Sequence, residues 1–462
     1  MTSTGNATCQ RLGRAWLVGI LFFLPFQITV AGYFANWNLQ LANVIYYLDE
    51  ITGVTFSILA FVKFNKNRLW FNTAVLNIFS SLTIFISIGV ISTIINYNHL
   101  NVSVLGIFDY AKNFLAIFIY AAFFRSIDDF KFIFRYLLII AIIFTGIASM
   151  QFIWAMGSVY IFEKEITDQS VYLFSDSHLI NPITLKNVVW RYGLFRADAI
   201  VLGAYILGLF NLLILTIYYY TARKIKLLIM IPLIIGIISS VSRMAYGGLC
   251  FLLLIQLIKK RSHFIILLVT VILASSFIIT SGNLNLGKLI DSYIPAKENI
   301  DKTNMRTSSR YTALEIWKKH PLFGVGPGRF GGIVASKYPS PVYNEYAINK
   351  RPIYKRYILK VGGIEQFWFQ ILAELGLVGV ACFIAIFLVI GLTLRRVKEL
   401  SSSSELSNIM SALIVFIGCI AIYCLGSGIN IASVFFTYCA FVGIGLGIVD
   451  NEYVKTPPQN HL

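Results

Sequence analysis

Charged residues are scarce in this sequence. Of its 462 residues only 13% are Asp, Glu, Lys or Arg, whereas 57% are apolar and 15% are aromatic. Soluble domains carry about a quarter of charged residues, so the composition excludes a soluble globular protein. About a dozen apolar stretches approach the roughly 20 residues that a helix needs to cross a bilayer. We therefore interpret the chain as an all-α, polytopic membrane protein, because a backbone in lipid must satisfy its own hydrogen bonds.

Several chemical motifs are missing as well. The cysteines show no C-x-x-C spacing and no H-E-x-x-H occurs, so the sequence indicates neither a disulfide framework nor a zinc site. The glycine-rich stretch GVGPGRFGG is not followed by G-K-[ST], which excludes a nucleotide-binding P-loop. We find no D-x-D pair that could hold a metal-bound nucleotide sugar on the outer side. We expect no metal and no other cofactor.

Acidic residues are fewer than basic ones, and the net charge is +17. The basic residues gather in alternate short gaps between apolar stretches, for example Lys63, Lys66 and Arg68. Short loops rich in Lys and Arg stay in the cytoplasm, which explains the charge without a nucleic-acid partner and places both termini there. The predicted spans are 15–34, 43–62, 70–94, 105–124, 133–154, 199–219, 227–241, 244–258, 263–281, 375–394, 408–425 and 429–449.

The longest polar segment, 282–362, lies between the ninth and tenth predicted spans of a single membrane domain, 1–462. We expect it to form a large, partly helical periplasmic loop. From 288 to 360 it has 14 Lys/Arg against 5 Asp/Glu, hence a net charge of +9, which favours an anionic ligand. Its spacing predicts a helix over 308–319, ended by His320-Pro321, and then a turn-rich stretch from Gly324 to Gly332.

Charges at the membrane rim are costly, so they are functional candidates. Arg243, in SVSRMAYGGL between two short apolar runs, is the sharpest, because a guanidinium fork suits a phosphate; the alternative is that it caps the preceding helix. Asp109 and Lys112 are one turn apart and are expected to pair. Further candidates for binding an anionic substrate or its acceptor are Arg191, Arg196, Arg306, Arg310, Arg329 and Asp49.

Four stretches, in this order, resemble motifs of the O-antigen ligase and polymerase superfamily of bacterial inner-membrane glycosyltransferases. They are WRYGLFRAD, SVSRMAYGGL, RYTALEIWKKHPLFGVGPGRFGG and EQFWFQILAELGLVG. The family pattern for the last stretch has a His-Asn pair. With Glu374 aligned to the family glutamate, this chain has Glu365 and Gln366 at those two positions.

The resemblance implies a C-type glycosyltransferase-like helical fold that works without a metal at the periplasmic face of the inner membrane. It implies an undecaprenyl-diphosphate-linked oligosaccharide as donor and a hydroxyl of an acceptor glycan as nucleophile. Arg243 and Arg310 match motif arginines and would hold the diphosphate, while Arg191 would help to bind substrate. Glu365 becomes the candidate base, since a desolvated carboxylate can accept a proton.

The missing histidine favours an inverting repeat-unit polymerase for O-antigen, capsule or exopolysaccharide, with membrane lipids and a chain-length regulator among its partners. The first alternative is a ligase of the same superfamily, which transfers the finished glycan to lipid A core or protein. The second is a flippase or other transporter of lipid-linked oligosaccharides. A transporter would show charges near the middle of the membrane and repeated halves, whereas this sequence concentrates charge at one rim and in one loop.

Overall fold

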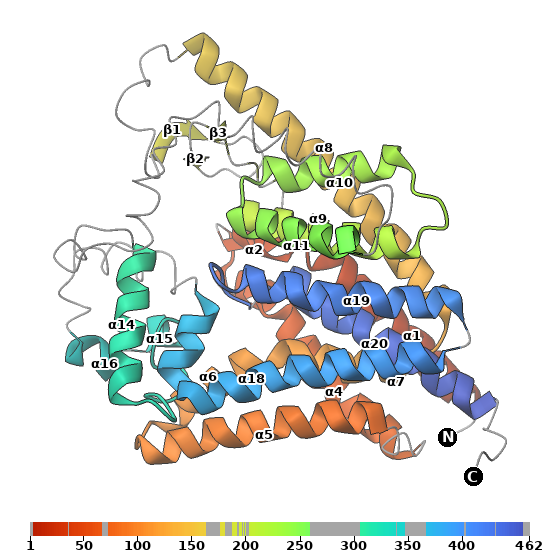
Figure 1. The fold of residues 1–462 in the computed structure, drawn as a ribbon, viewed down its shortest axis with the longest axis horizontal. Helices are drawn as coiled ribbons and strands as arrows, with labels where there is room; N and C mark the ends of the chain where they lie inside the picture. Colours follow the sequence, from red (N-terminus) through yellow and green to blue (C-terminus); the bar gives the residue numbers. More distant parts are fainter. Residues whose placement is uncertain are drawn as a thin grey trace.

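The protein is described by a computed structural model in which long helices lie side by side (Figure 1). The description covers all residues except 1–2, 36, 67–72, 163–175, 181–186, 192–193, 196, 198, 200–202, 259–304, 339, 347–365, 402, 430 and 456–462.

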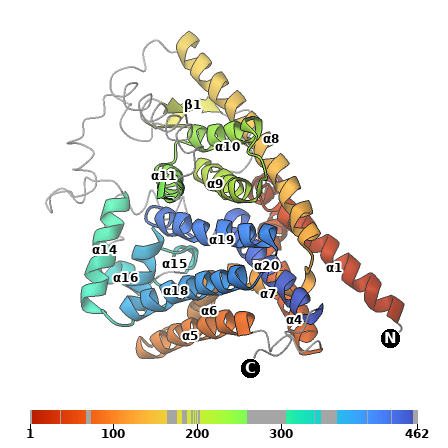
Figure 2. The same ribbon diagram turned by 45° about the vertical axis from the view of Figure 1, so that its right-hand side comes forward.

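The amino-terminal part is helical up to Phe162. Its elements are α1 (Ser3–Phe23), α2 (Gln27–Ala35), α3 (Leu39–Tyr46), α4 (Leu48–Lys66), α5 (Thr73–Ile95), α6 (Leu100–Ala111), a 3₁₀ turn (Lys112–Phe114), α7 (Leu115–Phe123) and α8 (Ile127–Phe162). Figure 2 shows α8 crossing the other helices obliquely. Contacts of α8 with α1, α9, α10 and α20 make it a brace along one flank of the bundle.

The first two predicted spans are broken helices, which corrects the expectation of continuous ones. The chain bends by 77° between α1 and α2 and by 52° between α3 and α4. Pro25 lies in the first break, where a residue without a backbone N–H ends the helix. The second break, at Tyr47, has no proline. There Asp49 and Glu50 fill the first turn of α4, a position at which acidic side chains stabilise a helix.

The middle part contains a small sheet followed by three helices. Strands β1 (Asp176–Ile180), β2 (Asn187–Arg191) and β3 (Leu194–Phe195) pair antiparallel in the order β1-β2-β3. This sheet is the one departure of the described residues from the predicted all-α class. The helices α9 (Ala204–Thr221), α10 (Leu227–Ser239) and α11 (Arg243–Ile258) follow.

The carboxy-terminal part combines short helices at one end of the molecule with long helices that run through the bundle. Its elements are α14 (Met305–Lys319), α15 (Ile333–Lys337), α16 (Pro341–Glu345), α18 (Phe367–Leu400), α19 (Ser404–Tyr423), a π-helix (Ala432–Phe436) and α20 (Thr437–Lys455). The short helices α14–α16 stand together across one end of the long helices (Figures 1 and 2). The predictions of a helix over 308–319 and of turns after Pro321 are confirmed.

Seven of the described helices are long and apolar enough to cross a membrane, or nine if each bent pair counts as one span. The helices α10 and α11, with 13 and 16 residues, are shorter than the roughly 20 residues of a usual span. The predicted span 263–281 lies outside the described residues. The structure is therefore that of a multi-pass membrane protein, and the number of twelve spans stays a prediction.

The two ends of the bundle can be distinguished by the contacts of α18 and α19. At the end that we call the α14 end, α14 packs on α18, and the N–H of Phe367 donates to Ser427 O in the turn after α19. At the opposite end, called the Glu405 end, α18 finishes and α19 begins. The start of α1 and the finish of α20 also lie at the Glu405 end (Figure 1). The cytoplasmic location of both termini stays a prediction.

Candidate functional site

Arg243 is the first residue of α11 and directly follows a tight turn from α10. The side chain is half-buried. Val241, two residues earlier, has φ of 43°, a left-handed conformation that strains a β-branched residue. Such strain persists only where the surroundings impose it, and it concentrates at functional sites. The turn therefore holds the start of α11, and with it Arg243, in an imposed position.

The end of the WRYGLFRAD stretch is attached to the chain at this turn. The N–H of Ala197 donates to Ser239 O at 3.0 Å. Ala199, also left-handed with φ of 50°, exchanges two hydrogen bonds of 2.9 Å with the side-chain amide of Gln151 on α8. Two of the four motif stretches thus meet at the start of α11.

Arg243 and the helix that carries Arg310 lie at the same end of the bundle. Met244 lies over Gly426 in the turn after α19, where an added Cβ would be 2.9 Å from Met244 Cε. The neighbouring Ser427 is bonded to the start of α18, against which α14 packs. Arg310 is half-buried in α14. The two arginines most central to the prediction are therefore at the α14 end.

The segment Pro321–Gly332, which we call the glycine-rich segment, connects α14 to α15. Gly324, Gly326, Gly328 and Gly331 all have positive φ. At Gly324 a Cβ would lie 2.4 Å from Ala373 O, and at Gly326 it would lie 1.6 Å from Asn98 Nδ2. Only glycine fits these conformations and contacts. The repeated glycines of this motif therefore allow close packing of the backbone.

The start of α18 holds one side of the glycine-rich segment. The N–H groups of Val325 and Gly326 donate to Ala373 O and Glu374 O at 3.0 and 2.8 Å. In return, Leu377 and Val378 donate to Pro321 O and Leu322 O. These last bonds are possible because Gly376, with φ of 65°, kinks α18. Helix and segment are thus joined by a short ladder of backbone hydrogen bonds.

The last turn of α5 and the loop that follows it hold the other side. Ser92 Oγ donates to Phe323 O at 2.6 Å, Asn96 Nδ2 to Gly324 O at 3.1 Å and Asn98 Nδ2 to Val325 O at 3.0 Å. Tyr97, between the two asparagines, is left-handed with φ of 50°. Three successive carbonyls of the segment are therefore bonded by the end of α5 and the loop after it, more than two hundred residues earlier.

Arg329 is fixed by the same loop. Its Nε donates to Asn98 Oδ1 at 2.7 Å, and its Nη2 also donates to that atom. Burial lowers the pKa of this half-buried guanidinium from a value far above neutrality, so it stays charged. Ser340 Oγ bonds Arg329 O at 2.6 Å. As a substrate-binding residue Arg329 remains a prediction, with its orientation set by Asn98.

Three charged residues near the α14 end form a buried triad, of which the sequence predicted one of the two ion pairs. The expected pair is confirmed, with Lys112 Nζ 2.9 Å from Asp109 Oδ1. Glu50 Oε1, from the first turn of α4, lies 2.7 Å from the same Nζ. The neighbouring Asp49 is 7% exposed and accepts a hydrogen bond of 2.7 Å from Gln27 Nε2. Asp49 stays a prediction for substrate binding, with one oxygen engaged by Gln27.

Four predicted residues are placed less completely. Arg191 ends β2 and Arg306 is in the first turn of α14, and for both only the backbone is described. Arg196 and the candidate base Glu365 lie outside the described residues. Their roles remain predictions.

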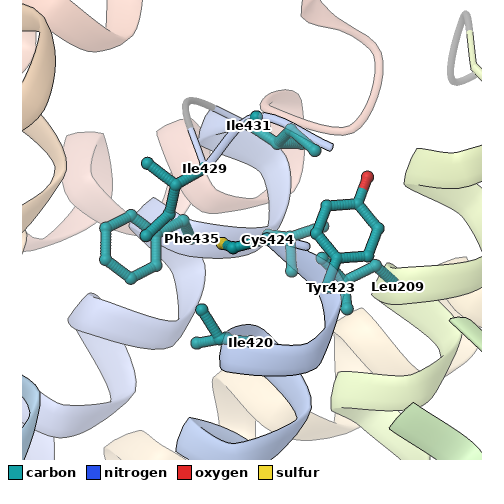
Figure 3. A pocket seen from close by; sticks show the side chains of 9 residues that line it. Leu209, Ile420, Tyr423, Cys424, Ile429, Ile431 and Phe435 are labelled. Atoms are coloured by element: carbon teal, nitrogen blue, oxygen red, sulfur yellow. The ribbon is translucent and has the colours of Figure 1, made fainter. Parts of the chain in front are cut away.

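A small pocket lies behind this end, between α9, the turn after α19 and the π-helix (Figure 3). In Figure 3 the rings of Phe435 and Tyr423 flank Cys424, with Ile420 on one side and Ile431 on the other. The lining is apolar, which does not fit a diphosphate. The cations Arg243, Arg310 and Arg329 of the α14 end lie on other elements, α11, α14 and the glycine-rich segment.

Comparison with known proteins supports the resemblance read from the motifs. Residues 227–384 match the family model described as O-antigen ligase, and this range contains Arg243, Arg310, the glycine-rich segment and Glu374. No curated protein matches the sequence. The second, third and fourth motifs all lie inside the matched range, so over residues 227–384 the chain is similar to the O-antigen ligase family.

Proposed function

We propose that this protein transfers a glycan from an undecaprenyl-diphosphate carrier to a hydroxyl of an acceptor sugar, and that it acts as a repeat-unit polymerase of O-antigen, capsule or exopolysaccharide. The observation that carries the proposal is the placement of Arg243 and of α14 at one end of a helical bundle, inside the segment that matches the O-antigen ligase family. In this proposal the α14 end faces the periplasm.

The chemistry requires cations at a fixed place. The acceptor oxygen attacks the anomeric carbon from the side opposite to the diphosphate, so the carbon–oxygen bond to the carrier breaks with inversion. Negative charge then grows on the departing undecaprenyl diphosphate. Arg243 and Arg310 hold this diphosphate, because guanidinium groups placed beforehand stabilise developing charge most effectively. The hydroxyl proton passes to Glu365, the candidate base.

The proposal includes four further arginines as substrate-binding residues: Arg191, Arg196, Arg306 and Arg329. They would bind the outer phosphate and the first sugars of the carrier, since a cationic rim raises the local concentration of an anionic substrate. Of these, Arg329 has the best-defined surroundings, because Asn98 orients its guanidinium. Asp49 would contact sugar hydroxyls.

The test uses the purified protein in detergent with a lipid-diphosphate repeat unit and gel analysis of product length. Arg243→Ala and Arg310→Ala should each lower the rate by about 100-fold or more, the typical loss when one group that stabilises the transition state is removed. Arg395→Ala is the matched control, because this arginine is exposed at the Glu405 end and pairs with Glu399. Wild-type transfer rates in both Arg243→Ala and Arg310→Ala, with the fold intact, would reject the mechanism.

The same reaction mixture separates polymerase from ligase. A polymerase produces a ladder of longer lipid-linked glycans from the repeat unit alone. A ligase leaves that unit unchanged and transfers glycan only when lipid A core or an acceptor protein is added. The polymerase assignment depends on the residue at position 365, so Glu365→Gln should stop polymerisation and Glu365→His should restore part of it.

A further inference from the structure

Glu374 is an acidic residue that the reaction described above does not use. It lies on α18 with no exposed surface. A carboxylate in such a place is stable only with hydrogen-bond donors around it. Tyr110 donates its hydroxyl to Oε2 at 2.6 Å, and the N–H of Phe330 donates to Oε1 at 2.7 Å. The N–H of Gly328 donates to the same carboxylate.

These donors come from two different parts of the fold. Tyr110 belongs to α6, while Gly328 and Phe330 belong to the glycine-rich segment. Helix α6 also touches that segment directly, since a Cβ on Gly106 would lie 2.4 Å from Gly328 N. The Glu374 side chain therefore joins α6, α18 and the glycine-rich segment at one point.

We propose that Glu374 is a positioning residue for glycan transfer: its carboxylate fixes the glycine-rich segment, and through it Arg329 and the end of α14, against α18. This inference rests on the proposed function. The carboxylate acts as a hydrogen-bond acceptor for the protein's own groups and exchanges no proton with substrate.

The location of the bonds explains how Glu374 acts at a distance. Gly328 and Phe330 flank Arg329, so the carboxylate restrains the backbone on both sides of the guanidinium that Asn98 holds. Helix α14 ends at Lys319, directly before the segment, and its residues Ala313 and Ile316 share a small core with Phe330 and Ala373. A shift of the segment would therefore move both Arg329 and α14, and a displacement of about 1 Å can lower a rate by about 100-fold.

Glutamine is the decisive replacement, because it has the same shape and cannot act as a base. Its amide oxygen can accept from the two N–H groups, and its NH₂ can donate to the Tyr110 oxygen once that hydroxyl turns. Glu374→Gln should keep the rate within about threefold of wild type, whereas Glu374→Ala should lose about 100-fold. Tyr110→Phe alone should lose less than about tenfold, because the two N–H donors remain.

The double variant Glu374→Gln with Tyr110→Phe sharpens the test. In it the NH₂ group loses its acceptor, so the combined loss should exceed the product of the two single losses. Glu399→Gln and Glu399→Ala are the matched controls, since this glutamate is 61% exposed at the Glu405 end. Both should leave the rate unchanged.

Hydrogen exchange measured by mass spectrometry gives a second readout that needs no activity. Peptides covering 321–332 should exchange faster in Glu374→Ala and at the wild-type rate in Glu374→Gln, because the N–H groups of Gly328 and Phe330 keep an acceptor only in the latter. A folded Glu374→Gln that is as inactive as Glu374→Ala would overturn the proposal in favour of a catalytic carboxylate. Wild-type rate or unchanged exchange in Glu374→Ala would also overturn it. If the wild type transfers no glycan while exchange responds as expected, the proposed function fails and the anchoring by Glu374 stands.

Discussion

The two ends of the bundle differ in one kind of ion pair: among the described pairs the buried ones lie at the α14 end, which also has the exposed pair Lys319–Glu345. At the α14 end, Lys112, Glu50 and Asp109 pair with side chains that are 13%, 23% and 13% exposed. At the Glu405 end, Lys131 and Glu405 pair at 2.6 Å with 49% and 35% exposure, and Arg395 pairs with Glu399 at 71% and 61%. Buried ion pairs impose one geometry, because a charge that loses its partner there is left without solvation. Exposed ion pairs contribute little to the free energy of folding. The α14 end is therefore the part in which polar groups specify structure.

The largest expected effect comes from breaking the buried triad. Lys112→Met leaves Glu50 and Asp109 without their shared cation, and it should lower the free energy of unfolding by about 3–5 kcal/mol. Thermal unfolding in detergent measures this loss. Lys131→Met is the control at the other end and should cost less than about 1 kcal/mol. Equal losses for the two lysines would remove the distinction between the ends.

A backbone change in the glycine-rich segment should come next. Gly326 has φ of 101° and no space for a Cβ, so Gly326→Ala should destabilise the protein by about 2–3 kcal/mol. Gly146→Ala is the matched control, because nothing lies within 4 Å of its Cβ position in α8. That control should be neutral or slightly stabilising, since alanine favours a helix. A neutral Gly326→Ala would contradict the close contact with Asn98.

The asparagine that orients Arg329 should have a smaller effect on stability. Asn98→Ala removes its bonds to Arg329 and to Val325 O and should cost about 1–2 kcal/mol. Asn98→Asp keeps the acceptor for the guanidinium and loses only the donor to Val325 O. We expect the aspartate variant to retain more glycan-transfer activity than the alanine variant. The opposite order would indicate that Arg329 needs no fixed orientation.

The smallest effect is expected at the most exposed pair. Arg223 is 91% exposed and lies 3.4 Å from Glu405. Arg223→Ala should change the free energy of unfolding by less than about 0.5 kcal/mol, and salt should reduce even this difference. A larger loss that persists in high salt would show that the Glu405 end also depends on specific polar contacts.

The sequence predicted much of this architecture because its signals are local. Apolar stretches located the helices, the i,i+3 spacing predicted the Asp109–Lys112 pair, and Pro321 with the following glycines predicted the end of α14 and the turns after it. The bend between α1 and α2 also had a local signal, the proline at position 25, but the prediction treated this stretch as one continuous span. The bend at Tyr47 and the strands β1–β3 had none that the pattern revealed.

The site was harder to predict because its contacts join distant parts of the chain. Glu374 could be matched to a family glutamate, yet its partners Tyr110 and Phe330 come from α6 and from the glycine-rich segment. Asn98 was not a candidate at all, although it orients Arg329. Nothing in the residues around Asn98 indicates a partner 231 positions away. Such contacts depend on which helices become neighbours, and spacing along the chain does not contain that information.

The kink at Gly376 has a mechanical consequence for α18. Because the N–H groups of Leu377 and Val378 bond to Pro321 O and Leu322 O, the usual rungs of the helix are interrupted there. Residues on both sides of the kink are thus bonded to the glycine-rich segment, Ala373 and Glu374 before it and Leu377 and Val378 after it. A tilt of the long part of α18 would therefore be transmitted directly to that segment, because both move as one bonded unit at Gly376.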